Sequence, residues 1–141
     1  MILDRDVLGE LVPEPLEYSL VIREGRLRFA PEFPASAVTV EGAAPGAFYE
    51  GLWEGDVAEL FLQLPDGGYL EYNVAPNGAW WACTFSEVRV RSEVYRSQDL
   101  PSLEHPIGNV TAILGGRYLT RFPLAGKQPD FHRPADFRAL L

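Results

Sequence analysis

The sequence predicts an all-β protein built as a two-sheet antiparallel β-sandwich, and three observations lead to this prediction. Short runs of alternating apolar, β-branched and aromatic residues are separated by clusters of Gly, Pro, Asn and Asp. No segment repeats its apolar residues at the period of an amphipathic helix. About nine strands at this spacing are typical of two packed antiparallel sheets. We therefore expect residues 1–141 to form a single domain, long enough to bury a core without disulfides.

Turn residues between strand-like runs predict three hairpins. The paired runs are 16–22 with 26–30, 57–64 with 69–74, and 111–114 with 117–122. Their turns read Glu-Gly, Asp-Gly-Gly and Gly-Gly, which are typical of hairpin loops. In the middle hairpin the apolar residues share one face only if the loop has an odd number of residues. We therefore expect a bulge there.

Other segments complete the predicted layout. Residues 37–41 and 87–91 alternate in polarity and are expected to be strands. Residues 42–52 and 97–109 are rich in turn formers and are expected to be long surface loops. The tail, residues 127–141, contains two prolines and is expected to lie across the sandwich with a short helical turn near its end.

Composition and charge argue against several kinds of partner. The formal net charge of −8 repels phosphate backbones and anionic membrane surfaces, so we expect neither nucleic acid nor a membrane as a partner. No apolar stretch approaches the ~20 residues of a transmembrane helix. The lone Cys83 cannot form an internal disulfide and is expected to be a small buried hydrophobe. Because the acidic N-terminal segment lacks the apolar run of a signal peptide, we expect a cytoplasmic location.

Two adjacent tryptophans, Trp80 and Trp81, follow the turn sequence Asn77-Gly78. Neighbouring side chains of a strand point to opposite faces, so the two indoles need different environments. If Asn77-Gly78 is a two-residue loop, Val74 lies opposite Trp81. This register predicts that Trp81 lies in the core and that Trp80 lies on the other, polar face.

That polar face is the predicted site. It gathers two carboxylates, two amides and two aromatic rings, from Glu59, Phe61, Gln63, Glu71, Asn73 and Trp80. Carboxylates and amides form directional hydrogen bonds with hydroxyl groups, and an aromatic ring offers a flat apolar surface to the C–H side of a pyranose. The combination suits a sugar. A cover of loops or tail packed over Trp80 would account for the same residues structurally.

Four segments resemble family 9 carbohydrate-binding modules and their DOMON-like relatives. They are LWEGDVAELFLQ (52–63), YLEYNVAPNGAWWA (69–82), Phe85 with Arg89, and PDFHRPADF (129–137). The resemblance covers roughly a third of the chain. It implies a β-sandwich that binds carbohydrate without catalysis.

The resemblance also implies roles for single residues. In family 9 modules a tryptophan before the Glu-containing strand forms part of an aromatic clamp, and the matching residue is Trp53. Glu59 matches an acceptor for sugar hydroxyls, and Arg89 matches a basic hydrogen-bonding partner. A second clamp tryptophan has no match other than Trp80, and no Asp-rich loop matches the calcium sites of these modules. The expected ligand is a mono- or oligosaccharide, held by Trp53, Glu59, Glu71, Asn73, Trp80 and Arg89.

Three alternatives remain open. A glycoside hydrolase could use Asp56, Glu59 and Glu71, although carboxylates on one sheet face more often share hydrogen bonds than act as acid and base. Some DOMON relatives bind haem, but the two histidines form no ligand pattern, so we expect no cofactor and no metal. An assembly module would bury aromatic residues such as Trp53 and Trp80 against another subunit, which would make the protein a homo-oligomer.

Overall fold

The computed structural model describes residues 1–101, 103–126 and 128–141, and over these residues the chain is all-β. The small sheet contains, in order, β1 (Ile2–Arg5), β2 (Leu11–Arg23) and β3 (Arg26–Glu32). The large sheet contains, from edge to edge, β10 (Arg138–Ala139), β8 (Ile107–Leu114), β4 (Val57–Gln63), β5 (Tyr69–Val74), β6 (Trp80–Glu87) and β7 (Val90–Val94), and β9 (Arg117–Thr120) also pairs with β8. Two short 3₁₀ turns, η1 (Leu52–Glu54) and η2 (Pro134–Asp136), precede β4 and β10.

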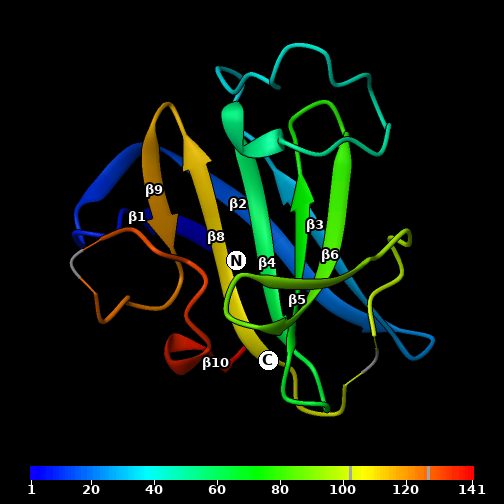
Figure 1. The fold of residues 1–141 in the computed structure, drawn as a ribbon. Helices are drawn as coiled ribbons and strands as arrows, with labels where there is room; N and C mark the ends of the chain where they lie inside the picture. Colours follow the sequence, from blue (N-terminus) through cyan, green and yellow to red (C-terminus); the bar gives the residue numbers. More distant parts are fainter. Residues whose placement is uncertain (102, 127) are drawn as a thin grey trace.

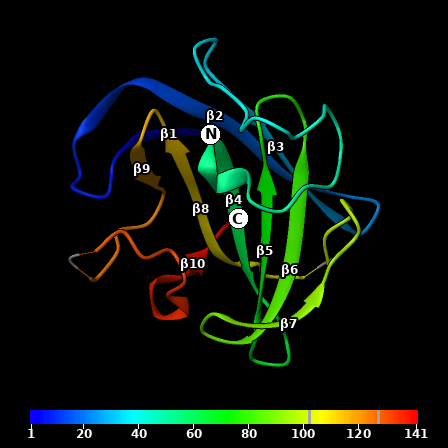
Figure 2. The same ribbon diagram turned by 45° about the horizontal axis from the view of Figure 1, so that its top comes forward.

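The two sheets form two layers, with the small sheet behind the large one in Figures 1 and 2. All strand pairs are antiparallel. The predicted architecture of two antiparallel sheets is therefore confirmed. No described residue belongs to a helix long and apolar enough to span a bilayer.

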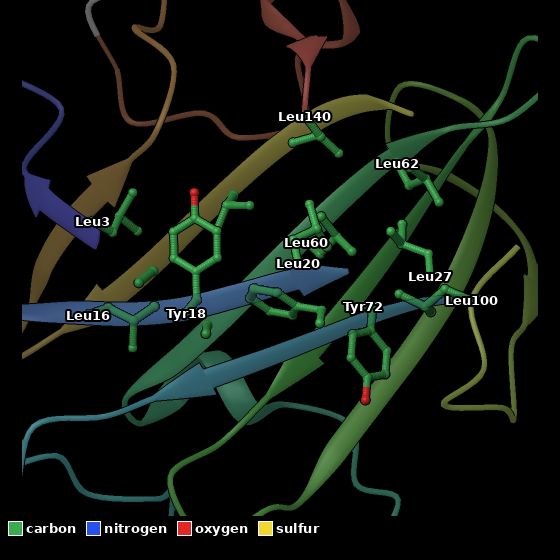
Figure 3. Packing of buried hydrophobic residues seen from close by; sticks show 14 of the residues in the cluster. Leu3, Leu16, Tyr18, Leu20, Leu27, Leu60, Leu62, Tyr72, Leu100 and Leu140 are labelled. Carbon is green, nitrogen blue, oxygen red and sulfur yellow. The ribbon is translucent and has the colours of Figure 1, made fainter. Parts of the chain in front are cut away.

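The main core lies between the sheets. Alternate residues of β4, including Leu60 and Leu62, point toward the small sheet and pack with Leu16 and Leu20 of β2. Figure 3 shows these leucines gathered between the two layers. Each fully buried leucine stabilises the fold by about 1.5–3 kcal/mol relative to an exposed one.

A second apolar cluster covers the outer face of the large sheet, the face that points away from the small sheet. The other residues of β4, Val57 and Phe61, belong to it together with Tyr69 of β5. Phe131 and Phe137 of the C-terminal tail pack onto the same cluster. The large sheet is therefore buried on both sides, which explains why β4 reads as a nearly continuous apolar run.

The hairpin predictions hold in three cases. Glu24-Gly25 and Gly115-Gly116 are two-residue loops with positive φ at every position, as type I′ turns require. The loop between β4 and β5 has three residues, 65–67, because Leu64 N–H donates to the Gly68 carbonyl. Gly67 adopts φ +93°, which supplies the expected bulge.

The register predicted for the β5–β6 hairpin is wrong by one residue. Ala75 N–H donates to the Ala79 carbonyl, so the loop has three residues, 76–78. Gly78 has φ +86°, but Asn77 does not have the positive φ that a type I′ turn requires. Asn73 therefore lies opposite Trp81, and Val74 lies opposite Trp80.

This shift exchanges the environments of the two tryptophans. Trp80 points toward the inter-sheet core, where its ring lies against Tyr72 and Phe48. Trp81 points to the outer face and is 2% exposed. The prediction of one indole on each face is confirmed, but the assignment of Trp80 to the polar face is wrong.

Several smaller predictions need correction. Residues 37–41 form no strand, and residues 87–91 contain the turn between β6 and β7 rather than one strand. The expected loop over 97–109 ends earlier, because β8 begins at Ile107. The tail has a helical turn, η2, but then forms strand β10 on the edge of β8. Residues 102 and 127, within these two segments, lie outside the described residues.

Candidate functional site

A cavity of about 450 Å³ opens on the outer face of the large sheet. Its floor comes from β4, β5 and β6, and its walls come from η1, the β6–β7 turn, β9 and the tail. The lining residues are Trp53, Glu59, Phe61, Glu71, Trp81, Phe85, Arg89, Arg91, Ile113, Tyr118, Pro129, Asp130, Phe131 and His132. A cavity of this size falls within the range of about 300–1,000 Å³ found for small-molecule sites.

Two neighbouring carboxyl groups lie at the bottom of this cavity. Glu59 projects from β4 and Glu71 from β5, and their side chains share the outer face because Glu59 pairs with Asn73 and Glu71 with Phe61. Glu59 is 4% exposed and Glu71 is 5% exposed. Burial, together with the charge of Glu71 and a hydrogen bond to it, raises the pKa of Glu59 well above its ordinary value. The neighbouring Glu71 and the burial therefore both favour the protonated form of Glu59.

Polar side chains flank the carboxyl pair beneath the cavity. Asn73 and Thr111 lie directly opposite Glu59 on the two neighbouring strands, and both are fully buried. Asn73 Nδ2 donates to Glu71 Oε1 over 3.2 Å. Asn73 Oδ1 and Thr111 Oγ1 have no hydrogen-bond partner. One buried oxygen without a hydrogen-bond partner therefore lies on each of the two strands that flank Glu59.

A chain of hydrogen bonds fixes His132 at the side of the cavity. The backbone N–H of Arg89 donates to Tyr69 Oη over 3.0 Å, and Tyr69 Oη lies 2.8 Å from His132 Nδ1. Tyr69 Oη accepts from Arg89 and can donate its own proton to Nδ1 when the imidazole proton is on Nε2. His132 Nε2 lies 3.6 Å from Glu71 Oε2.

His132 is a neutral ring in this setting. Burial lowers its pKa, and the opposing charge of Glu71 only partly offsets this. Its imidazole is enclosed by the rings of Phe61 and Phe85, with centroids 5.2 Å away in each case. The site therefore holds the His132 N–H in a fixed direction toward the carboxyl pair.

Aromatic rings form much of the remaining wall. Trp53, in η1, is 42% exposed and meets the buried Trp81 edge to face at 6.1 Å. Across the cavity, the half-exposed Tyr118 of β9 packs on Phe131 of the tail. These rings give a bound molecule apolar surfaces next to the hydrogen-bonding floor.

Two arginines of the β6–β7 hairpin lie at the rim of the cavity. Arg89 pairs with Asp130 of the tail, and Arg91 pairs with Glu50. The guanidinium of Arg91 also lies over the Trp81 ring, 5.1 Å from its centroid. Both guanidinium groups are largely exposed, and their charges are already matched by the partner acids.

Most of the predicted site residues fall in this cavity. Trp53, Glu59, Glu71 and Arg89 line it, and Asn73 lies beneath it in contact with Glu71. Trp80 does not belong to the site, because the three-residue loop turns it toward the other face. Trp81 takes the place that was expected for Trp80.

Sequence reasoning missed His132, Arg91 and Tyr118. The tail motif around His132 was recognised, but nothing in the sequence alone places a tail residue against β5, because that contact spans 63 residues. Arg91 could have been found from the alternation of Val90 and Arg91 after the turn.

Comparison of the chain with family models, curated proteins and solved structures gave no match. Among the described residues no group of three or more His, Cys, Asp and Glu side chains could hold a metal ion. Fold and site together define an all-β protein with a carboxyl-floored, aromatic-walled cavity on one sheet.

Proposed function

We propose that the chain is a non-catalytic carbohydrate-binding domain of the DOMON-like kind, which holds a mono- or oligosaccharide in the cavity on the large sheet. One observation carries this proposal. The carboxyl pair of Glu59 and Glu71 and the rings of Trp53 and Trp81 line the same cavity. The resemblance to family 9 modules supports it, because Trp53, Glu59 and Arg89 all match binding positions of that family.

The chemistry of the floor supports a polyhydroxylated ligand. Glu71 accepts hydrogen bonds, whereas neutral Glu59 can both donate and accept, and the arginines at the rim donate. A sugar presents several adjacent hydroxyl groups that each donate and accept, so it can satisfy such a mixed set. Its C–H face can lie against the indole of Trp53, which is partly exposed at the mouth of the cavity.

The position of the two carboxyl groups argues against a glycoside hydrolase. Glu59 and Glu71 are close enough to share a hydrogen bond. A glycosidase needs about 5 Å or more between its carboxyl groups, because the scissile bond lies between them. Binding without hydrolysis therefore accounts better for the geometry.

The aromatic residues do not support a single assembly surface. Trp53 lines the cavity on the outer face, whereas Trp80 packs toward the inter-sheet core with Tyr72. The two tryptophans therefore cannot be buried together against one partner subunit on the face first predicted. Association between copies of the chain is an alternative that the following experiment separates from sugar binding.

The test is a glycan-array and thermal-shift screen of the wild-type chain and two variants. Trp53→Ala removes an exposed ring from the cavity mouth, whereas Leu8→Ala removes an exposed apolar side chain in the β1–β2 loop. We expect sugars that raise the melting temperature of the wild type to bind Leu8→Ala with equal affinity and Trp53→Ala about fivefold more weakly, since one stacked ring contributes roughly 1 kcal/mol. A melting temperature that rises with protein concentration and not with any sugar would overturn the proposal in favour of assembly.

A further inference from the structure

Among the described residues, no Lys or Arg side chain forms an ion pair with the buried Glu71. Within the described parts of the chain, the side chain within ion-pair distance of Glu71 is His132, at 3.6 Å, and burial keeps that imidazole neutral. The two arginines at the rim form ion pairs with other acids: Arg89 pairs with Asp130, and Arg91 pairs with Glu50. A buried negative charge is costly unless a positive group balances it.

A proton on Glu59 now takes the place of that cation. The raised pKa of Glu59 favours a proton on this carboxyl group beside Glu71, and that proton lowers the negative charge of the cavity floor. A ligand cation that entered the cavity could balance both carboxylates and release this proton to solvent.

The carboxyl oxygens of Glu59 and Glu71 can accept hydrogen bonds from a ligand in the cavity. Glu59 and Glu71 both line the cavity, whereas Asn73 and Thr111, which lie opposite Glu59 on the neighbouring strands, are buried beneath it and do not line it. An ammonium group has three N–H donors and no acceptor, whereas a hydroxyl group has one donor. Two neighbouring carboxylates that line the cavity offer several acceptor oxygens and no donor, which suits an ammonium group better than a hydroxyl group.

The aromatic walls favour the same charge. The rings of Phe61, Phe85 and Trp81 line the cavity beside the carboxyl pair. The face of an aromatic ring attracts a cation through its quadrupole, and the attraction is stronger where water is excluded. The Arg91 guanidinium already lies over Trp81, and Phe85 is stacked on Tyr69, so the partly exposed ring of Trp53 is the one most open to a positively charged ligand.

From this arrangement we propose that the ligand of the cavity carries a primary ammonium group, which within the proposed function makes it an amino sugar. This inference rests on the proposed sugar site and specifies its ligand class. On binding, the ammonium group pairs with Glu59 and Glu71, and the Glu59 proton passes to solvent. The floor then holds two carboxylates and one ammonium, and the charge of the ammonium group replaces that of the released proton.

The experiment is isothermal titration calorimetry of the wild-type chain with glucosamine, glucose and methylammonium, at slightly acidic pH where the amine is protonated. Repeating the titrations in two buffers of different ionisation enthalpy measures proton release. We expect glucosamine to bind about tenfold or more tightly than glucose, because a charge-assisted hydrogen bond is roughly twice as strong as a neutral one. Glucosamine binding is expected to release protons and glucose binding is not.

Two variants test whether the carboxyl pair causes the preference for glucosamine over glucose. Glu71→Gln removes the buried charge and is expected to abolish the preference for glucosamine over glucose. Glu17→Gln removes an exposed carboxylate from the small sheet and is expected to keep the preference. If Glu71→Gln does not fold, the wild-type comparison and its proton count decide the question alone.

Each outcome separates this inference from the function on which it rests. Glucose that binds as tightly as glucosamine, or glucosamine that binds without proton release, overturns the ammonium inference and leaves sugar binding intact. Methylammonium that binds as tightly as glucosamine supports the ammonium site but overturns the proposal that the cavity binds a sugar. A chain that binds none of the three ligands refutes both.

Discussion

The protonation of Glu59 gives the most specific prediction about stability. Glu59→Gln replaces a neutral carboxylic acid by a neutral amide of almost the same shape, so the variant keeps a hydrogen-bond donor toward Glu71. The pKa of Glu59 is raised in the folded protein by burial and by Glu71. The folded state therefore binds a proton more tightly than the unfolded state does.

The sign of the pH dependence follows from this difference. A raised pKa in the folded state contributes stability that is complete below the ordinary glutamate pKa of 4.5 and is lost as the pH rises through the folded pKa. Within this window each pH unit lowers the free energy of unfolding of the wild type by about 1.4 kcal/mol relative to Glu59→Gln.

Urea unfolding of both proteins across this pH range measures the difference directly. The titration of His132 and of the surface acids is common to both chains, so it cancels in the comparison. Glu17→Gln removes an exposed carboxylate, and its free energy of unfolding is expected to change with pH as that of the wild type does. A protonated Glu59 would be refuted if the free energy of unfolding changed with pH in the same way in wild type and Glu59→Gln. It would also be refuted if the wild type became more stable relative to the variant as the pH rose.

Three further substitutions test the fold and the hydrogen-bond chain. Leu60→Ala removes a fully buried side chain from the inter-sheet core and is expected to lower the free energy of unfolding by about 2–5 kcal/mol in urea; a cost below that range would argue against a packed core. Gly108→Ala is expected to cost more than about 4 kcal/mol or prevent folding, because the new Cβ would lie 1.8 Å from the Phe61 carbonyl oxygen; a folded variant of ordinary melting temperature would contradict the β4–β8 pairing. Tyr69→Phe removes the hydroxyl group that bonds both Arg89 N–H and His132 Nδ1. At about 0.5–1.5 kcal/mol for each hydrogen bond we expect a total loss of about 1–3 kcal/mol in the same assay, and an unchanged midpoint would contradict the hydrogen-bond chain through His132.

The sequence was sufficient for the two-sheet architecture and for three hairpins because these depend on local signals. Glu24-Gly25 and Gly115-Gly116 have the positive φ values that two-residue loops need, and polar and apolar residues alternate along the strands that they join. The placement of Glu59 and Glu71 on one face followed from the leucine pattern of β4 and β5 and is confirmed.

The error at the tryptophans has a physical cause in the turn. Pro76 precedes Asn77 and Gly78, and proline fixes φ near −65°, which suits the first position of a type I turn. Gly78 then supplies the positive φ of the bulge, as Gly67 does after Pro65. The two loops share a Pro-Asn/Asp-Gly pattern, and reading them alike would have put Trp81, not Trp80, beside the carboxylates.

The rest of the site depends on contacts between distant parts of the chain. His132 reaches the cavity only because the tail folds across the outer face, and the Arg89–Asp130 pair also joins segments far apart in sequence. Arg89 contributes its backbone N–H from a residue with φ 60° in the β6–β7 turn. Alternation and turn residues contain no information about such contacts.

The central claim is that Trp81 and the carboxyl pair face a sugar, and two single-tryptophan proteins test it most directly. Trp53→Phe/Trp80→Phe leaves Trp81 as the only indole, and Trp53→Phe/Trp81→Phe leaves Trp80. Titration with a panel of sugars and amino sugars is expected to change the fluorescence of Trp81 in a saturable way and to leave that of Trp80 constant. A response confined to Trp80, or no saturable response from either protein, would contradict a saccharide site on this face.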